Sequence, residues 1–232
     1  MKNKKGFTLA EVLITLGIIG VVAAMTMPVL IQNHRNSVVE ARLKKFYSVM
    51  NQAVIMAEND YGDKKEWYED LTGAEIDNDG NPIPGSSELE KWFNKYLMPY
   101  LIEVKTETLS NGTFMVYFPD GSALATASAG RGRDWYFYPL NPEKCMNRTQ
   151  EKANGICRFV FNFKPVGDEY SWKYHIDRGF EPTKYRWDGS LENLYKGCSD
   201  KISDGILHSH CTALIQYNGW KIPKDYPFRI SY

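Results

Sequence analysis

Residues 6–31 read GFTLAEVLITLGIIGVVAAMTMPVLI and follow the short basic leader MKNKK. From Phe7 the stretch runs for 25 residues with a single charged side chain, Glu11. A helix of this length spans about 37 Å, which exceeds the roughly 30 Å hydrocarbon core of a bilayer. The sequence therefore predicts a membrane-spanning helix at the N-terminus.

Glu11 is unexpected in such a helix, because an acidic side chain near the middle of a membrane costs about 2.5–3.5 kcal/mol. A cut between Gly6 and Phe7 would remove three lysines and create a new ammonium group on Phe7, four residues before Glu11. Opposite charges attract strongly in an apolar medium, and two neighbouring helices bring them together more easily than one helix does. We therefore expect Glu11 to be satisfied when a second subunit docks in the correct register.

The basic leader, the junction Gly6-Phe7-Thr8-Leu9, Glu11 and the aliphatic run resemble the N-terminal processing signal of type IV pilins and type II secretion pseudopilins. The resemblance implies that prepilin peptidase cleaves after Gly6 and N-methylates Phe7. It also implies that Glu11 pairs with the Phe7 amine of an adjacent subunit during fibre assembly. Beyond the signal, the globular part resembles pseudopilin-like proteins more loosely, for example in residues 211–223, CTALIQYNGWKIP.

Two simpler interpretations of the stretch remain open. A secretory signal peptide has an apolar core of about 7–15 residues and a cleavage site of small residues, for which Val22-Ala23-Ala24 would serve. The apolar run is too long for that class, and it contains a carboxylate. A plain signal anchor fits the length but leaves both Glu11 and the Gly6-Phe7 junction unexplained.

The chain is expected to divide into a leader at residues 1–6, a transmembrane and assembly half of the helix at 7–31, an amphipathic half at 32–60 and an exported globular domain at 61–232. All six tryptophans and fourteen of the fifteen tyrosines lie beyond residue 60. Without the three leader lysines the chain has 25 basic against 28 acidic residues, so charge gives no reason to expect nucleic acid as a partner.

The charges that flank the apolar run do not decide its orientation, because both sides are basic: Lys2, Lys4 and Lys5 before it, and Arg35, Arg42, Lys44 and Lys45 after it. The four cysteines do favour one orientation. They form two local pairs, Cys145 with Cys157 and Cys198 with Cys211, which suits two disulfides in an exported domain, although three connectivities are possible. We expect a single-pass protein of the bacterial inner membrane whose C-terminal domain is periplasmic or extracellular.

The helix is predicted to continue to about residue 60 and to end at Gly62. Its second half is amphipathic, since apolar residues recur at intervals of four and three: Val39, Leu43, Phe46, Met50, Ala53 and Ala57. This stripe is shorter than three heptads, which favours contact with the chain's own domain over a coiled coil. Pro28 is expected to kink the helix or to melt it locally.

An antiparallel sheet is predicted after the helix, giving an α+β, pilin-like fold with disulfide-tied loops. Residues 113–118 and 122–126 should form a hairpin, and residues 134–138, 156–163 and 170–176 further strands. Short helices are expected at residues 87–97, capped by Ser87 and ended by Pro99, at 190–196, stopped by Gly197, and at 210–218, stopped by Gly219.

No motif in the sequence indicates catalysis or a cofactor. Residues 77–82 (DNDGNP) have oxygen ligands suited to calcium, but the glycine comes one place too early and no glutamate closes the loop, so a turn is favoured. Residues 129–133 (AGRGR) lack the lysine and the helix of a phosphate loop. His208 and His210 with Cys198 and Cys211 would suit zinc, but a disulfide explains the cysteines more simply. The aromatic clusters at 135–138 and 185–187 are assigned to core packing.

Three functions are compatible with these features. The favoured one is a non-enzymatic structural subunit of a type IV pilus or a type II secretion-like filament, with other copies or related pilins as partners. Its production would involve prepilin peptidase and, indirectly, an assembly platform protein and an ATPase. The alternatives are a minor, tip-located pilin for adhesion or DNA uptake, in which Arg131 and Arg133 are candidate contacts, and a membrane-anchored exported enzyme.

Overall fold

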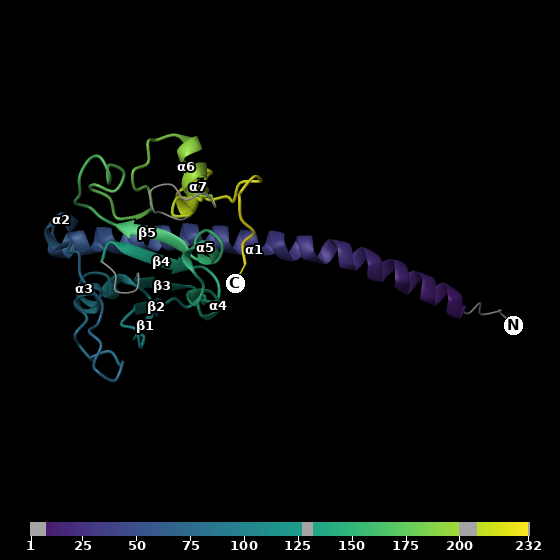
Figure 1. Cartoon of the computed structure of the whole chain (residues 1–232), viewed down its shortest axis with the longest axis horizontal. Helices are drawn as coiled ribbons and strands as arrows, with labels where there is room; N and C mark the ends of the chain where they lie inside the picture. Colours follow the sequence, from purple (N-terminus) through teal and green to yellow (C-terminus); the bar gives the residue numbers. More distant parts are fainter. Residues whose placement is uncertain (1–7, 127–131, 200–207, 232) are drawn as a thin grey trace.

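The computed structural model describes residues 8–126, 132–199 and 208–231. Its longest element is α1 (Leu9–Tyr61), a helix of 53 residues. The first part of α1 projects alone from the rest of the chain, whereas its second part lies along the sheet (Figure 1). Gly62 follows the last turn with φ +83°, and its N–H donates a hydrogen bond to the Glu58 carbonyl. The predicted extent and end of the helix are thus confirmed.

Pro28 lies inside α1 without interrupting it. The expected local melting is therefore wrong. A proline removes one N–H from the hydrogen-bond ladder, but the turns on either side keep their bonds, and the Thr26 hydroxyl donates a further one to the Val22 carbonyl at 3.0 Å. The projecting half of the helix bows smoothly along its length in Figure 1.

The sheet is a six-stranded antiparallel meander in which sequence neighbours are also spatial neighbours. The predicted hairpin forms, with Met115 opposite Ala125. Strands that follow one another in the sequence are usually adjacent in space, which favours this simple order. The strands are β1 (Lys105–Thr108), β2 (Phe114–Tyr117), β3 (Ala123–Thr126), β4 (Asp134–Tyr138), β5 (Phe159–Phe163) and β6 (Phe180–Pro182).

One predicted strand is wrong and two strands were missed. Residues 170–176 form turns instead of a strand, because Asp168 accepts a hydrogen bond from the Ser171 N–H, and the Trp172 N–H bonds back to the Asp168 carbonyl. The strand predicted at 156–163 starts later, at Phe159. The two missed strands, β1 and β6, are the edges of the sheet. β1 is polar, and β6 has only three residues and ends in proline.

The core lies between α1 and one face of the sheet. Every residue of the predicted stripe is buried, and Val54 joins it. Phe46 lies at the centre, with its ring centroid 4.3 Å from that of Phe137 and 4.8 Å from that of Phe161. α3 (Glu88–Tyr96) adds Leu89, Trp92 and Phe93 to the same core, and α2 (Lys64–Trp67) adds Trp67. α3 ends before Pro99, as predicted, and the 3-10 helix η1 (Met98–Tyr100), which was not predicted, follows it.

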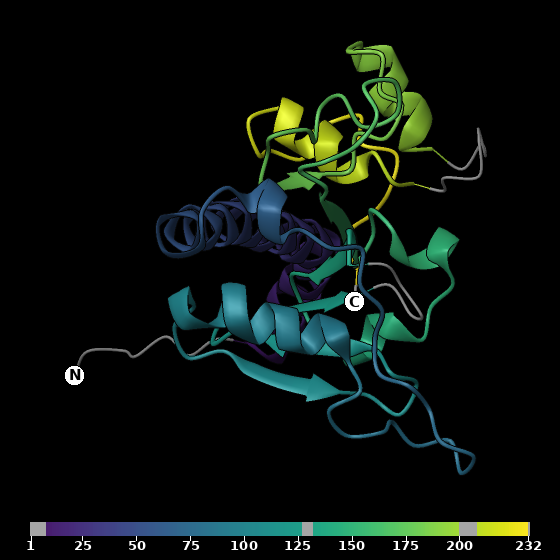
Figure 2. The same ribbon diagram turned by 90° about the vertical axis from the view of Figure 1, so that its left-hand side faces the viewer.

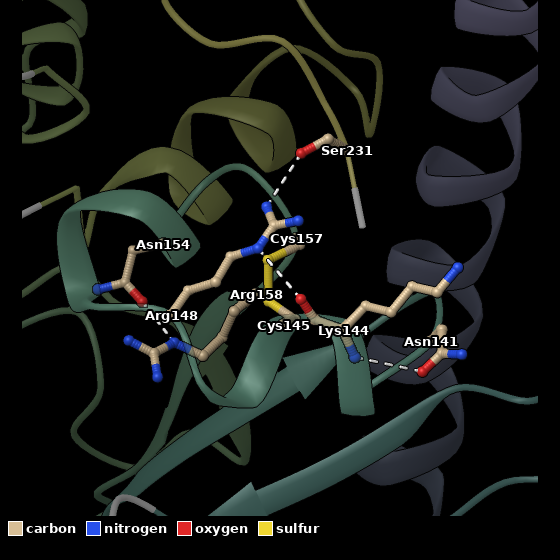
Figure 3. Close-up of a disulfide and its surroundings, with 8 residues drawn as sticks. All are labelled: Asn141, Lys144, Cys145, Arg148, Asn154, Cys157, Arg158 and Ser231. Atoms are coloured by element: carbon tan, nitrogen blue, oxygen red, sulfur yellow. Dashed lines mark hydrogen bonds between the residues drawn. A yellow bond between two sulfur atoms is a disulfide. The ribbon is translucent and has the colours of Figure 1, made fainter.

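The two local cysteine pairs form disulfides, Cys145–Cys157 and Cys198–Cys211. The first joins α4 (Glu143–Met146) to the turn after α5 (Gln150–Ala153), and it lies over the face of the sheet that points away from α1. Figure 3 shows this disulfide beside Arg148, whose guanidinium donates to the Lys144 carbonyl and to the Ser231 hydroxyl near the C-terminus.

The second disulfide joins α6 (Leu191–Gly197) to the start of α7 (Cys211–Tyr217). Both helices were predicted, and Ser190 caps α6 by accepting a hydrogen bond from the Asn193 N–H. Seen along α1, they lie on one side of it, while α3 and the first strands lie on the other (Figure 2). The α+β, pilin-like architecture expected from the sequence is the one observed.

Candidate functional site

The projecting half of α1 exposes apolar side chains around its whole circumference. Residues 9–31 are exposed apart from Ala23, and they include Leu13, Ile18, Met25 and Leu30, each more than half exposed. Among the described residues α1 is the one helix long and apolar enough to cross a membrane. A helix that is apolar on all sides needs cover from lipid or from other helices.

The helix begins with a capping box formed by Thr8 and Glu11. The Glu11 N–H donates to the Thr8 Oγ1 at 3.2 Å, while the Thr8 N–H and hydroxyl both donate to Glu11 Oε2 at 2.8 Å. Each side chain thus satisfies a backbone N–H that the first turn leaves without an intrahelical partner. The negative carboxylate also lies at the positive end of the helix dipole.

Thr8 is the residue that the sequence interpretation missed. The partner of Glu11 is predicted from the sequence to lie on a neighbouring chain. The pattern Thr-x-x-Glu ahead of an apolar run is, however, the signature of a capping box within one chain. The cap supplies neutral donors and leaves the charge of Glu11 in place. Its second oxygen, Oε1, accepts no hydrogen bond from the described residues. Gly6 and Phe7 lie outside the described residues.

The C-terminal segment holds α1 where its projecting half begins. Gln32 Nε2 donates to the Ile230 carbonyl at 3.2 Å and Oε1 accepts from the Arg229 guanidinium at 2.8 Å. About two turns further along α1, Glu40 accepts a hydrogen bond from the Ile222 N–H at 2.9 Å and forms an ion pair with Lys221. These contacts fix the direction in which the apolar half leaves the domain.

Two family models together cover nearly the whole chain. Residues 1–27 match the prokaryotic N-terminal methylation motif. Residues 29–230 match a family of unknown function, DUF6613. The chain belongs to that family. No curated protein and no solved structure matches it. The N-terminus of this DUF6613 member is therefore a prepilin-type signal, and the chain is a type IV pilin-like or pseudopilin-like subunit that is processed.

The loop at residues 77–82 is a closed turn. Its first carboxylate, Asp77, accepts hydrogen bonds from the Asp79 and Asn81 N–H groups at 2.9 and 2.8 Å, and the Gly80 N–H donates to the Asp77 carbonyl. The described residues contain no group of three or more His, Cys, Asp or Glu side chains able to hold a metal ion. The hydrogen bonds within residues 77–82 confirm the predicted turn.

The possible zinc ligands near α7 are occupied or buried. Cys198 and Cys211 are bonded to each other. His210 Nε2 donates a hydrogen bond to the Tyr185 carbonyl at 3.0 Å, and burial lowers the pKa of its imidazole, which favours the neutral ring. His208 packs against the Phe228 ring. These histidines belong to the interior of the α6–α7 region.

The aromatic residues 135–138 and the glycine-rich residues 129–133 were the remaining candidates from the sequence. Trp135 and Phe137 are buried in the core against α1 and α3, whereas Tyr136 lies on the opposite face of the sheet. Arg133 forms an ion pair with Asp134. Arg131 and the glycine-rich residues up to it lie outside the described residues.

Proposed function

We propose that the chain is a structural subunit, a pilin or pseudopilin, of a type IV pilus or a type II secretion-like filament. The observation that supports this most strongly is the methylation motif at the start of a helix whose first half is exposed, apolar and charged at one position. In this proposal residues 1–6 are removed, 7–31 insert in the membrane and then the filament, 32–60 pack on the domain, and 61–232 form the exported body.

Glu11 supplies the selectivity of assembly. Its cap involves neutral donors, so a full negative charge enters the apolar environment with the helix. In such an environment an unpaired charge is costly and a counter-charge is strongly attracted. The methylated amine of Phe7 on an adjacent subunit provides that counter-charge once Gly6 and the leader have been removed. A subunit in the wrong register leaves the charge of Glu11 without a partner.

The proposed location follows from the N-terminal helix and from the disulfides of the globular body. The N-terminal helix holds the protein in the bacterial inner membrane in a single pass, and the body is periplasmic or extracellular, where disulfides persist. Its partners are other pilins or pseudopilins and prepilin peptidase, with the assembly platform and its ATPase acting indirectly. The role is structural rather than enzymatic, because both the motif and the helix serve assembly.

The charge of Glu11 can be tested separately from its capping role. Glutamine occupies the third position of a capping box as well as glutamate does, so Glu11→Gln keeps the cap and removes the charge. We expect this variant, expressed in the native host, to reach the membrane at the wild-type level and to yield at least tenfold less protein in the sheared-filament fraction. Glu11→Ala should behave in the same way.

The matched control is Thr8→Ala, which weakens the cap and keeps the charge. It should assemble nearly as the wild type does. The proposal is wrong if Glu11→Gln enters filaments normally, or if Thr8→Ala is as defective as Glu11→Gln, since capping rather than charge would then explain the requirement.

A further inference from the structure

A cavity of about 400 Å³ lies on the face of the sheet that points away from α1. Two cross-strand pairs of β4 and β5 form its floor, Asp134 opposite Asn162 and Tyr136 opposite Val160. Side chains alternate between the two faces of a strand, so these four lie opposite the aromatic residues that contact α1. The volume is within the range of small-molecule sites, roughly 300–1,000 Å³.

The walls of the cavity come from segments that are distant in the sequence. Trp172, Thr183 and Tyr185 come from the chain on either side of β6, and Asn154 comes from the end of α5. The Trp172 and Tyr185 ring centroids are 4.9 Å apart, so together they form one aromatic wall. Asp168, at the rim, is exposed to solvent.

Buried polar atoms without partners surround this cavity. Asn162 is 1% exposed, and its Nδ2 donates to Asp134 at 2.7 Å, but its Oδ1 has no hydrogen-bond partner among the described residues. The same holds for the hydroxyl groups of Thr183 and Ser209, both of which line the cavity. A buried polar group left unpaired costs about 1–3 kcal/mol. A ligand that carries hydroxyl groups would supply the missing partners.

The lining carries one basic side chain, Arg133, and two acidic ones, Asp134 and Asp168. Arg133 Nε lies 3.2 Å from Asp134 Oδ2, and the Arg133 guanidinium lies 5.4 Å from the centre of the Trp172 ring. Arg133 and Asp134 neutralise each other, which leaves the negative charge of Asp168 at the rim and disfavours an anion as the ligand. Val160 is the one aliphatic side chain in the lining of the described residues, which disfavours a lipid chain.

Next to the cavity, the same face of the sheet is covered by other parts of the chain. Met115, Ala123 and Ala125 are buried there under the loop tied by Cys145 and Cys157. Alanine, methionine and tyrosine side chains and the disulfide fill that interface. At the cavity the side chains on the same face are mostly polar and line an open space. The polar residues therefore lie where the sheet face borders the cavity.

We propose that the cavity floored by Asp134 and Asn162 and walled by Trp172 binds a neutral saccharide unit. A sugar ring has hydroxyl groups at its edge, which match amide, carboxylate and hydroxyl partners, and a C–H face, which packs against an aromatic ring. Asn162, Thr183 and Ser209 bind hydroxyl groups, and Trp172 with Tyr185 contacts the apolar face. Binding at this site does not depend on filament assembly.

Saturation-transfer NMR on the full-length protein in detergent tests the proposal. The probes are the methyl glycosides of glucose, galactose, mannose and N-acetylglucosamine, with methyl glucuronide as a charged comparator. At least one neutral glycoside should receive saturation, and the charged comparator should receive less. The near-isosteric variants Asn162→Leu and Thr183→Val should each weaken its binding at least tenfold.

Tyr217→Ala is the matched control, because Tyr217 is an exposed aromatic residue that does not line the cavity. Thermal unfolding of each variant shows whether it remains folded, and Thr183→Val, the smaller change, decides the outcome if Asn162→Leu unfolds. The proposal is overturned if none of the four neutral glycosides binds, if the glucuronide binds better, or if the cavity variants bind as the wild type does. None of these results would affect the filament proposal, which is tested by assembly.

Discussion

The two halves of α1 belong to one continuous helix but have opposite distributions of apolar residues. In residues 9–31 apolar side chains occur on every side and are exposed. In residues 39–57 they are confined to one stripe, and that stripe is buried in the domain. A one-sided stripe is covered by the chain's own sheet, whereas an all-round apolar surface needs cover from outside the chain. The helix therefore serves folding in one half and association in the other.

The boundary between the two halves is marked by polar contacts with the C-terminal segment. Gln32 donates a hydrogen bond to the Ile230 carbonyl and Glu40 accepts one from the Ile222 N–H, almost two hundred positions later in the sequence. The globular domain covers α1 only as far as these contacts. Substitutions on the two sides of this boundary should consequently have different effects.

The largest difference should come from the same substitution placed in each half. Leu43 is fully buried and Leu13 is 59% exposed. Leu43→Ala should lower the free energy of unfolding of the domain by about 2–5 kcal/mol, because it removes buried contacts and leaves a cavity. Leu13→Ala should leave the free energy of unfolding of the domain unchanged. Chemical denaturation of both full-length variants in detergent, followed by tryptophan fluorescence, measures this, and equal effects would contradict the division of α1.

A smaller effect is expected at the boundary. Glu40→Ala should destabilise the C-terminal segment by about 1–2 kcal/mol, because the partly buried Ile222 N–H loses its charged acceptor. Lys221→Ala is the control, since the Lys221 side chain is 70% exposed and its ion pair with Glu40 contributes little. Amide hydrogen exchange of residues 219–231 should increase in the first variant and barely change in the second. Similar exchange in both would show that the ion pair, not the amide contact, holds the segment.

The smallest effect should be at the tip of the projecting half. Thr8→Ala removes a helix cap worth about 1 kcal/mol, so the amides of the first turn should exchange faster in detergent micelles while the stability of the domain stays the same. Thr8→Ser retains the hydroxyl and should exchange as the wild type does. A loss of domain stability in Thr8→Ala would mean that the two halves of α1 are energetically coupled.

The sequence predicted the four longest helices, α1, α3, α6 and α7, because their signals are local, but it did not predict the four-residue helices α2, α4 and α5. The stripe from Val39 to Ala57 has helical periodicity, Ser87 and Ser190 are strong caps, and Gly62 and Gly219 supply positive φ after the last turns. The two disulfides follow the same logic, since each joins cysteines that are close in the sequence.

The errors occurred where tertiary context or a competing local bond decides the structure. Residues 170–176 have the aromatic composition of a strand, but the side chain of Asp168 directs the chain into turns. The edge strand at Lys105 is polar and has no apolar alternation to reveal it. The cavity between Asn162 and Trp172 was not predictable, because strand registers and a loop bring its residues together. The Thr8–Glu11 cap was readable from the sequence and was overlooked.

The N-terminus of the mature protein tests the central claim most directly. Intact-mass and N-terminal peptide analysis of the chain purified from filaments of its native host should find N-methylated Phe7 as the first residue. Assembled protein that still begins at Met1, or protein that begins at Met25 after signal-peptide removal, would contradict the account.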